Sequence, residues 1–310
     1  MMPSLELAEV AVCVLTYKRG PMLTACLESL AAQSGVDRRW RIVVVDNDSA
    51  ASARERVEVA QAGDYPPIQY VVEAEPGISA ARNAAVANAS NAEFIAFIDD
   101  DEVADPTWLS ALLIAQADYD ADVVQGSVQS QLEPGGPTWV SRGRFFDRRL
   151  TARGAPLATA AAGNVLIRTS VLAQLQGPFN LKYGMTGGED THLFCQLRKM
   201  GNLIISAPEA RVIETIPITR QSIRWLLTRS LRSSSTWSRI EREILHRRLW
   251  RSRRVFSAAY SMALSTGSTA LGIVTFRKDR VARGVCHAGR AIGALGGLTH
   301  IDVNEYRRRA

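Results

Sequence analysis

Residues 94–102 read FIAFIDDDE, an apolar run that ends in four acidic side chains. An apolar run of this length that stops at a polar turn is typical of a buried strand. Similar runs lie at residues 10–15, 41–46 and 68–72, and each is followed by a polar or helical stretch. Apolar strands that alternate with helices form a parallel sheet with helices on both faces. The sequence therefore predicts an α/β domain on a mostly parallel central sheet.

The pattern continues less regularly towards the C-terminus. Residues 123–128 are predicted to form a fifth strand, and residues 163–167 a short strand with a glycine at its start. The Gly-rich loop GMTGG at 184–188 leads into a helix that begins near Glu189 and Asp190. Acidic residues at a helix start interact favourably with the helix dipole, so capping alone explains this pair.

Charge divides the chain into two parts. The net charge is +6, from 37 Lys+Arg against 31 Asp+Glu. Residues 218–310 hold 19 Lys+Arg and 5 Asp+Glu, a net charge of +14, whereas residues 1–217 hold 18 and 26, a net charge of −8. We therefore expect a main domain over residues 1–217 and a basic helical region over residues 218–310.

The basic region has the pattern of surface helices. Residues 221–232 and 237–256 are predicted to be helical, and the second places arginines opposite an apolar face. Residues 255–276 carry no charge for 22 residues but are rich in Ser, Thr, Gly and Ala. This combination favours attachment to an anionic membrane surface. A helical subdomain packed on the main domain and a true membrane span are the alternatives.

Composition excludes several function classes. The four cysteines are scattered singly, which supports neither a disulfide framework nor structural zinc. The N-terminal stretch carries Glu6 and Glu9 and no basic residue, which argues against a signal peptide and makes a cytoplasmic setting the default. The Gly-rich patterns of dinucleotide and P-loop sites are absent. The basic charge comes with no nucleic-acid recognition motif, so we expect no nucleic-acid partner.

Polar side chains gather where the predicted strands end. Thr16 follows the first strand, Asp46 and Asp48 follow the second, and residues 99–101 follow the fourth. Ligands bind beyond the carboxyl ends of the strands in such sheets. A single Asp there is usually a turn residue, but three carboxylates in a row repel one another unless a cation offsets them. Oxygen ligands suit Mg²⁺ or Mn²⁺ held with a phosphate-bearing substrate, and a solvated acidic turn is the alternative.

These segments together resemble the family-2 glycosyltransferases, which have the GT-A fold for nucleotide-sugar binding. The matching stretches are VLTYKR (14–19), VVDNDS (44–49), GISAARN (77–83), FIDDD (97–101) and GGED (187–190). Within that family the chain is similar to bacterial exopolysaccharide glycosyltransferases of the succinoglycan type. The resemblance implies inverting transfer of a sugar from a nucleoside-diphosphate sugar, by default a UDP-hexose. The implied acceptor is a hydroxyl of a lipid-linked oligosaccharide or polysaccharide.

The resemblance also implies a role for each matching residue. The residues expected to bind the nucleotide or donor sugar are Thr16, Asp46, Asp48, Arg82, Asp99, Asp100, Gly163 and Asn164. Asp99 and Asp101 match the outer residues of the family's DxD motif, where a divalent metal, Mg²⁺ or Mn²⁺, meets the diphosphate. Asp190 matches the catalytic base, and Glu189 is the alternative.

Two further matches have two interpretations each. Gln221, Arg224 and Trp225 fit a QxxRW pattern associated with diphosphate and acceptor binding, although a match this short arises readily by chance in an Arg-rich stretch. Glu214 is expected at a strand end near the site, either in a structural salt bridge or in a functional role. His192 is expected to be a packing or surface residue.

Two other functions compete with sugar transfer. A sugar nucleotidyltransferase has a Gly-rich, Arg-containing loop after its first strand, whereas residues 16–21 read TYKRGP. A non-catalytic carbohydrate-binding relative need not keep Asp99, Asp101 and Asp190 together. The sequence therefore favours a glycosyltransferase, expected to be cytoplasmic and peripheral at the inner face of the cell membrane.

Overall fold

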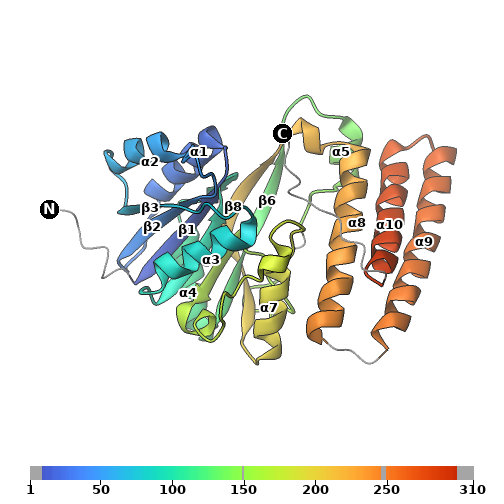
Figure 1. The fold of residues 1–310 in the computed structure, drawn as a ribbon. Helices are drawn as coiled ribbons and strands as arrows, with labels where there is room; N and C mark the ends of the chain where they lie inside the picture. The colour runs from blue at the N-terminus through green and yellow to red at the C-terminus, as the bar shows by residue number, and fades with distance from the viewer. Residues whose placement is uncertain (1–8, 149, 246–248, 299–310) are drawn as a thin grey trace. The chain divides into compact units, whose positions relative to one another are not determined.

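The computed structural model describes residues 9–148, 150–245 and 249–298. Over these residues eight strands form one sheet in the order β3-β2-β1-β4-β7-β6-β8-β5 (Figure 1). The strands are β1 Val10–Thr16, β2 Trp40–Asp46, β3 Ile68–Val72, β4 Phe94–Asp99, β5 Glu102–Ala104, β6 Val123–Leu132, β7 Asn164–Arg168 and β8 Ile204–Ile216. Residues 1–8, where the sequence predicts no signal peptide, and residues 299–310 of the predicted basic region lie outside the described part.

Four strands on one side of the sheet are parallel, as predicted. β2 pairs with β3 and with β1, and β1 pairs with β4 so that Leu15 lies opposite Asp99. Side chains along β1 alternate between two hydrophobic clusters: Val12 and Val14 face one, and Cys13 and Leu15 face the other. Both faces of this part of the sheet are therefore buried.

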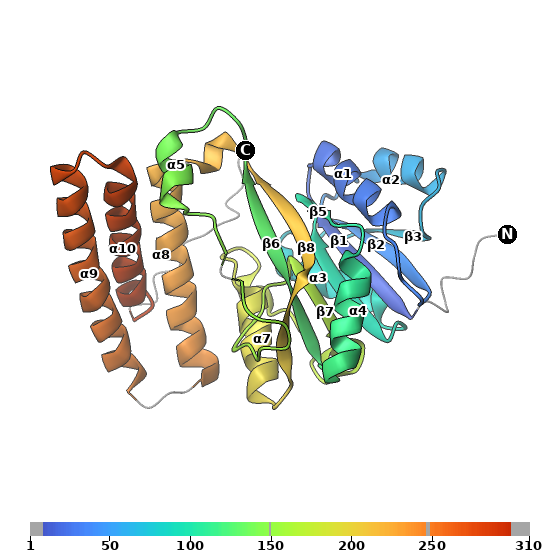
Figure 2. The same ribbon diagram turned by 180° about the vertical axis from the view of Figure 1, so that it is seen from behind.

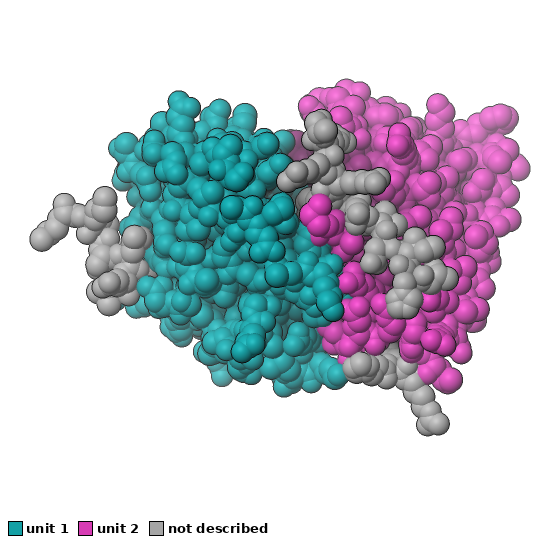
Figure 3. Space-filling view, viewed as in Figure 1, with its two compact units in different colours: residues 1–129, 148–184, 189–214 teal, residues 130–147, 185–188, 215–310 magenta. Residues whose placement is uncertain are grey.

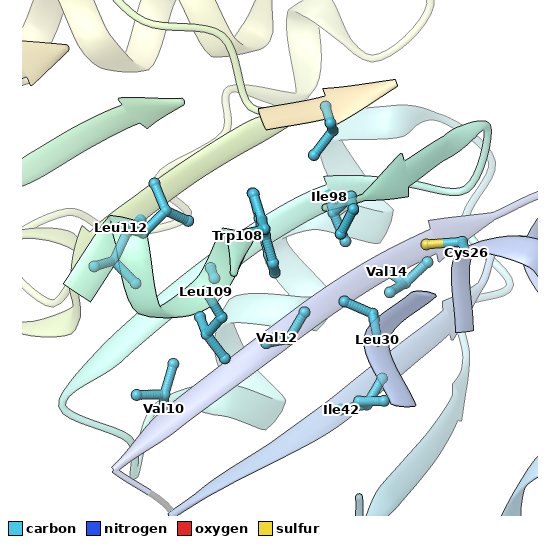
Figure 4. Packing of buried hydrophobic residues seen from close by; sticks show 14 of the residues in the cluster. Val10, Val12, Val14, Cys26, Leu30, Ile42, Ile98, Trp108, Leu109 and Leu112 are labelled. Atoms are coloured by element: carbon cyan, nitrogen blue, oxygen red, sulfur yellow. The ribbon is translucent and has the colours of Figure 1, made fainter. Parts of the chain in front are cut away.

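Helices cover both faces (Figures 1 and 2). They are α1 Gly20–Ala31, α2 Arg54–Gln61, α3 Ile78–Ala89, α4 Trp108–Tyr119, α6 Thr169–Leu172 and α7 Glu189–Lys199, with a 3-10 turn, η2, at Leu181–Tyr183. The helices α1, α2 and α4 join the cluster that contains Val12, whereas α3, α6 and α7 join the one that contains Cys13. In Figure 4, Trp108 and Leu109 lie above Val12 in the first cluster. Full burial of one such side chain contributes about 1.5–3 kcal/mol, so these two clusters dominate the stability of the sheet.

The other part of the sheet is antiparallel. β7 pairs antiparallel with both β4 and β6, and β5 pairs antiparallel with β8. Residues 123–128 form a strand, as predicted, but β7 lies between it and β4. The sequence did not indicate this neighbour, because a buried apolar strand has the same composition whichever way its neighbour runs.

The chain divides into two compact units, which Figure 3 shows in different colours. Unit 1 comprises residues 1–129, 148–184 and 189–214, and unit 2 comprises residues 130–147, 185–188 and 215–310. Unit 2 thus adds two short stretches from the middle of the chain to the C-terminal helices. The functional division at residue 217 stays a prediction.

Unit 2 is built mainly of helices. They are α5 Thr138–Gly143, the 3-10 turn η3 Ile218–Arg220, α8 Ile223–Ile240, the π-helical segment η4 Glu241–Leu245, α9 Trp250–Val274 and α10 Lys278–Gly296. α10 lies between α8 and α9 and packs against both (Figures 1 and 2). Its glycines allow this close packing, because a Cβ at Gly284 would lie 2.9 Å from the carbonyl oxygen of Ser265 on α9.

The predicted single helix over residues 237–256 is wrong. α8 ends at Ile240, and α9 begins at Trp250, directly after Leu249, which adopts a left-handed φ of 65°. A left-handed residue ends the helical path, and the periodicity of apolar residues does not report backbone angles. Residues 246–248 of the predicted helix lie outside the described part. Among the described helices, none has the length and hydropathy needed to cross a membrane.

Candidate functional site

Asp100 ties the end of β4 to the end of β1. Its carboxylate is 4% exposed and accepts hydrogen bonds from Thr16 Oγ1 at 2.9 Å and from Arg19 Nη1 at 2.9 Å. The same Arg19 nitrogen donates to Asp101 Oδ2 at 3.1 Å. Burial raises the pKa of Asp100, and the charge of Arg19 opposes that shift. The strand-end groups Thr16 and Asp100 are therefore brought together, as their positions after neighbouring strands predict.

Arg82 links the acidic cluster to the start of α7. From α3, its guanidinium forms an ion pair with Glu189 through Nη1 and lies 3.6 Å from Asp99 Oδ1 through Nη2. The side chains of Arg82 and Glu189 are each 6% exposed. A buried guanidinium is stable only when its charge is paired, so these contacts hold three distant segments together. Arg82, Asp99 and the segment at residues 189–190 thus lie together.

Asp99 is the open carboxylate of the cluster. Its side chain keeps 41% of its surface exposed, although protein surrounds it on its other sides. This partial burial raises the pKa of Asp99 to about 6, the charge of Arg82 opposes the shift, and Asp101 and Asp100 add to it by repulsion. Loss of solvent and repulsion from the neighbouring carboxylates thus both favour the protonated form of Asp99 when no cation is bound.

Glu102 hydrogen-bonds to the backbone of Asp99. It is 2% exposed, and its Oε2 accepts a hydrogen bond from the backbone N–H of Asp99 at 3.2 Å. Burial raises the pKa of Glu102 well above its ordinary value, and the negative charge of Asp99 adds to the shift. Glu102 lies opposite Glu214 in the β5–β8 register, and Arg148 Nη2 lies 2.7 Å from Glu214 Oε2. Glu214 thus forms the salt bridge that was one of its two predicted interpretations.

Three of these residues were not among the predicted site residues. Arg19 is the last residue of the matching stretch 14–19, and Glu102 directly follows the matching stretch 97–101, so the signal that could have identified both was their place in or beside these motifs. Arg148 comes from an irregular stretch in which no sequence pattern marks it. Only the fold places Arg148 beside Glu214.

Gly163 lies against the acidic cluster, where a side chain has no room. A Cβ there would be 2.8 Å from Asp99 Oδ2 and 3.2 Å from Glu102 Oε1. The next residue, Asn164, is fully buried, and its side chain is engaged in the core. Its Oδ1 accepts from Trp108 Nε1 at 2.8 Å, and its Nδ2 donates to two backbone carbonyls at 2.8 and 2.9 Å. The Asn164 side chain therefore anchors β7, and donor binding by this residue stays a prediction.

Asp46 is enclosed by the turn that follows β2 and by Tyr70 on β3. It is 0% exposed, and its oxygens accept hydrogen bonds from the N–H groups of Asp48 and Ala53 and from the Tyr70 hydroxyl, at 2.8–3.1 Å. Asp48 is also buried, and Lys18 Nζ lies 3.9 Å from its Oδ2. Asp46 therefore shapes the turn after β2, and the predicted contact with the nucleoside stays a prediction.

Asp190 is the second residue of α7 and is partly exposed. Its Oδ1 accepts from the N–H of Thr191 at 2.6 Å and from the Thr191 hydroxyl at 3.2 Å. Among the described residues, none bonds to Oδ2. Glu189, by contrast, is buried against Arg82. Of the two candidate bases, Asp190 is the more exposed, and Glu189 is the one paired with Arg82.

The predicted QxxRW residues lie in unit 2. Gln221 is buried, and its amide donates to the carbonyls of Glu133 at 3.1 Å and Ile216 at 3.0 Å. The Trp225 ring packs on Phe146 with centroids 5.4 Å apart. Arg224 is exposed. Gln221 and Trp225 therefore have structural roles within their unit, and a role in diphosphate or acceptor binding stays a prediction. His192 packs on Tyr183, as expected.

The β4 carboxylates suit a divalent cation that a ligand completes. In the part of the chain that the structure describes, no group of three or more His, Cys, Asp or Glu side chains is arranged to hold a metal by itself. Mg²⁺ usually takes one or two protein carboxylates and fills its shell with substrate phosphates and water. Asp99, whose side chain is 41% exposed, is open to such a role, whereas Arg19 bonds to both Asp100 and Asp101. Metal binding by Asp99 and Asp101 stays a prediction.

Solved structures share this fold. A mannosyltransferase from Pyrobaculum calidifontis, solved with GDP-Man and Mn²⁺, superposes with a TM-score of 0.67 over 94% of this chain and 87% of its own, at 18% identity. S. aureus TarS residues 1–349, solved with UDP, superposes with a TM-score of 0.51 over 97% of this chain and 93% of its own, at 19% identity. These similarities show the GT-A fold that the motifs predict.

Sequence comparison identifies the family. Residues 11–176 match the model of glycosyl transferase family 2. The chain is 35% identical over 295 residues to the succinoglycan biosynthesis protein ExoM of Rhizobium meliloti, which covers 94% of each protein. It is also 27% identical over 135 residues to the uncharacterized glycosyltransferase YibD of Escherichia coli, over 43% of this chain and 38% of that one. The chain therefore belongs to glycosyl transferase family 2 and is a glycosyltransferase.

Proposed function

We propose that this glycosyltransferase moves a sugar with inversion from a nucleoside-diphosphate sugar, a UDP-hexose, to an acceptor hydroxyl. The observation that carries the proposal is the contact of Arg82 with both Asp99 and Glu189. It brings a carboxylate suited to a metal and the segment that bears Asp190 to one buried arginine. Leaving-group stabilisation and proton removal, the two tasks of sugar transfer, then fall to neighbouring segments.

The donor is held by its charged diphosphate. Asp99 and Asp101 would hold a divalent metal, Mg²⁺ or Mn²⁺, which would supply positive charge to the departing diphosphate. The nucleoside would bind at the edge of the sheet where the strands end, beside Thr16, Asp46, Asp48 and Asp100. Support for this donor class comes from the fold neighbours: the Pyrobaculum mannosyltransferase was solved with GDP-Man and Mn²⁺, and TarS residues 1–349 were solved with UDP and with UDP-GlcNAc.

Asp190 is the proposed base. Its Oδ2 takes the proton of the acceptor hydroxyl as the hydroxyl oxygen bonds to the anomeric carbon. The bond from that carbon to the diphosphate oxygen breaks, and the nucleoside diphosphate leaves with the electron pair. Thr191 holds Oδ1, so the carboxylate is oriented before the acceptor arrives.

The proposed acceptor is a lipid-linked oligosaccharide or polysaccharide in exopolysaccharide biosynthesis. The support is the relative named for succinoglycan biosynthesis, which matches the chain over nearly its whole length. A lipid-linked acceptor requires a protein at a membrane, so the proposed location is peripheral, at the inner face of the cell membrane.

The test is nucleotide release with Mn²⁺, a panel of nucleotide sugars and a polyprenyl-diphosphate-sugar acceptor. Asp190→Asn should abolish transfer and leave donor binding, measured by calorimetry, nearly intact. Asp120→Asn is the matched control, because that carboxylate is 91% exposed and pairs with Arg168, away from the site residues. Transfer that persists in Asp190→Asn would refute the base. Donor binding by the wild type without transfer to any acceptor would indicate the non-catalytic alternative.

A further inference from the structure

The helix α9 exposes large apolar side chains, and the residues that it buries are all small. Its inner side, with Ala258, Ser261, Ser265 and Gly272, is buried, and the Ser265 hydroxyl donates to the carbonyl of Gly284 on α10 at 2.8 Å. We define its outer face as Phe256, Tyr260, Leu271, Ile273 and Val274, which are 50–76% exposed, with Phe276 just beyond the helix at 94%. At 100° per residue, the five helical positions fall within one half of the helix. A helix that merely completes a soluble bundle has the opposite arrangement.

The apolar surface is framed by positive charge. No charged residue occurs from Val255 to Phe276. Arg251 and Arg253 are exposed at the start of the helix, and Lys278 is exposed just after its end. A hollow of about 490 Å³ at that start is lined by Leu249, Ser252, Arg253, Arg254, Phe256 and Ser257, so guanidinium groups lie beside apolar surface there.

We propose that the outer face of α9 docks on an anionic phospholipid bilayer and lies within its interface. Large apolar side chains between cationic ends match the acyl–headgroup boundary, where the chains take the apolar groups and the phosphates take the arginines. A second copy of the chain fits less well. Pairing two α9 helices in either direction would bring cationic ends together, and that repulsion opposes association. The proposal does not depend on the donor, the acceptor or Asp190.

The test is co-sedimentation of the full chain with vesicles, in the absence of nucleotide. Vesicles of phosphatidylglycerol and phosphatidylcholine are compared with vesicles of phosphatidylcholine alone. The wild type should bind the anionic vesicles, and binding should weaken as NaCl is raised. The triple variant Ile273→Gln, Val274→Gln, Phe276→Gln should bind the vesicles at least about tenfold more weakly. Each substitution removes the favourable free energy of transferring one apolar side chain from water into the membrane interface.

A matched control carries the same kind of change on unit 1. Val59 and Ile114 are 70% and 53% exposed, and Val59→Gln with Ile114→Gln should leave vesicle binding unchanged. Thermal unfolding checks that the triple variant is folded. Wild-type binding by the folded triple variant, or equal binding to uncharged vesicles, would overturn the proposal. A dimer in sedimentation velocity that the triple variant abolishes, with no vesicle binding by the wild type, would assign the face to a second copy. Sugar transfer to a water-soluble acceptor, measured in parallel, reports on the proposed function separately.

Discussion

Neutralising Glu189 tests the ion pair at the centre of unit 1. Glu189→Gln keeps the shape and one acceptor oxygen but removes the charge opposite Arg82. Both side chains are 6% exposed, so little water can replace the lost charge. Loss of one partner of a buried pair costs about 3–5 kcal/mol. Because Asp99 also lies 3.6 Å from Arg82 and the amide can still accept a hydrogen bond, we expect the lower end, about 3 kcal/mol.

The coupling between the two residues is measured with a double-mutant cycle. Arg82→Met should cost about 3–5 kcal/mol, because it leaves the buried carboxylate of Glu189 without its guanidinium. The double variant should be more stable than the sum of the two losses predicts, by at least about 1 kcal/mol, since no uncompensated charge is left. Thermal melting is the assay, and a loss of 3 kcal/mol corresponds to roughly 6–12 °C for a domain of this size.

The outcome that refutes this reasoning is additivity. If each single variant lowers stability by less than about 1 kcal/mol and the two effects simply add, the contact does not hold the segments together. A second measurement separates structure from function. Glu189→Gln should also lower kcat for sugar transfer, because Asp190 follows Glu189 directly at the start of α7. An unchanged kcat would mean that Asp190 is positioned without this pair.

Two further predictions concern the acidic cluster. Gly163→Ala should lower kcat by about 10–100-fold with little change in melting temperature, because its Cβ would displace the Asp99 carboxylate, 2.8 Å away; a normal kcat would contradict this. The free energy of unfolding of the metal-free protein should fall as pH rises from about 4 to 6. Asp99 has a pKa of about 6 in the folded state and a lower pKa in the unfolded state, so the folded state binds the proton more tightly and loses that advantage as the proton leaves. Melting curves across this range test it, and Asp99→Asn should flatten the dependence; the same slope in both proteins would contradict it.

Local signals in the sequence were sufficient for the parallel strands and the acidic edge. β1, β2 and β4 are mostly apolar and bounded by polar turns, and a strand buried on both faces needs no partner to be recognised. The carboxyl ends of parallel neighbours lie at one edge, which is why Thr16 and Asp100, 84 positions apart, form a hydrogen bond. Motif order then identified the family before any contact was known.

The sequence contains no comparable local signal for the contacts in the antiparallel part of the sheet. The place of β7 between β4 and β6 depends on which strand edge it meets, and its residues, NVLIR, do not encode that choice. Asn164 illustrates the consequence. As a polar residue beside a glycine it matched a donor-binding position, yet Trp108 and two carbonyls engage its amide in the core. Polar residues that anchor a strand and those that bind a ligand are alike in sequence, and only burial distinguishes them.

Burial also explains how so many carboxyl groups share one strand end. Arg19 offsets Asp100 and Asp101, Arg82 offsets Glu189, and Arg148 offsets Glu214. Glu102, in the same cluster, is handled differently: its pKa is raised well above the ordinary value, so it keeps its proton to a higher pH. Two adjacent carboxyls whose environments differ this much take different roles. Glu102 accepts a hydrogen bond from the backbone N–H of Asp99, so it holds the end of β4 in place while adding little negative charge. Asp99, more exposed, is left to carry the charge that a metal and a diphosphate would require.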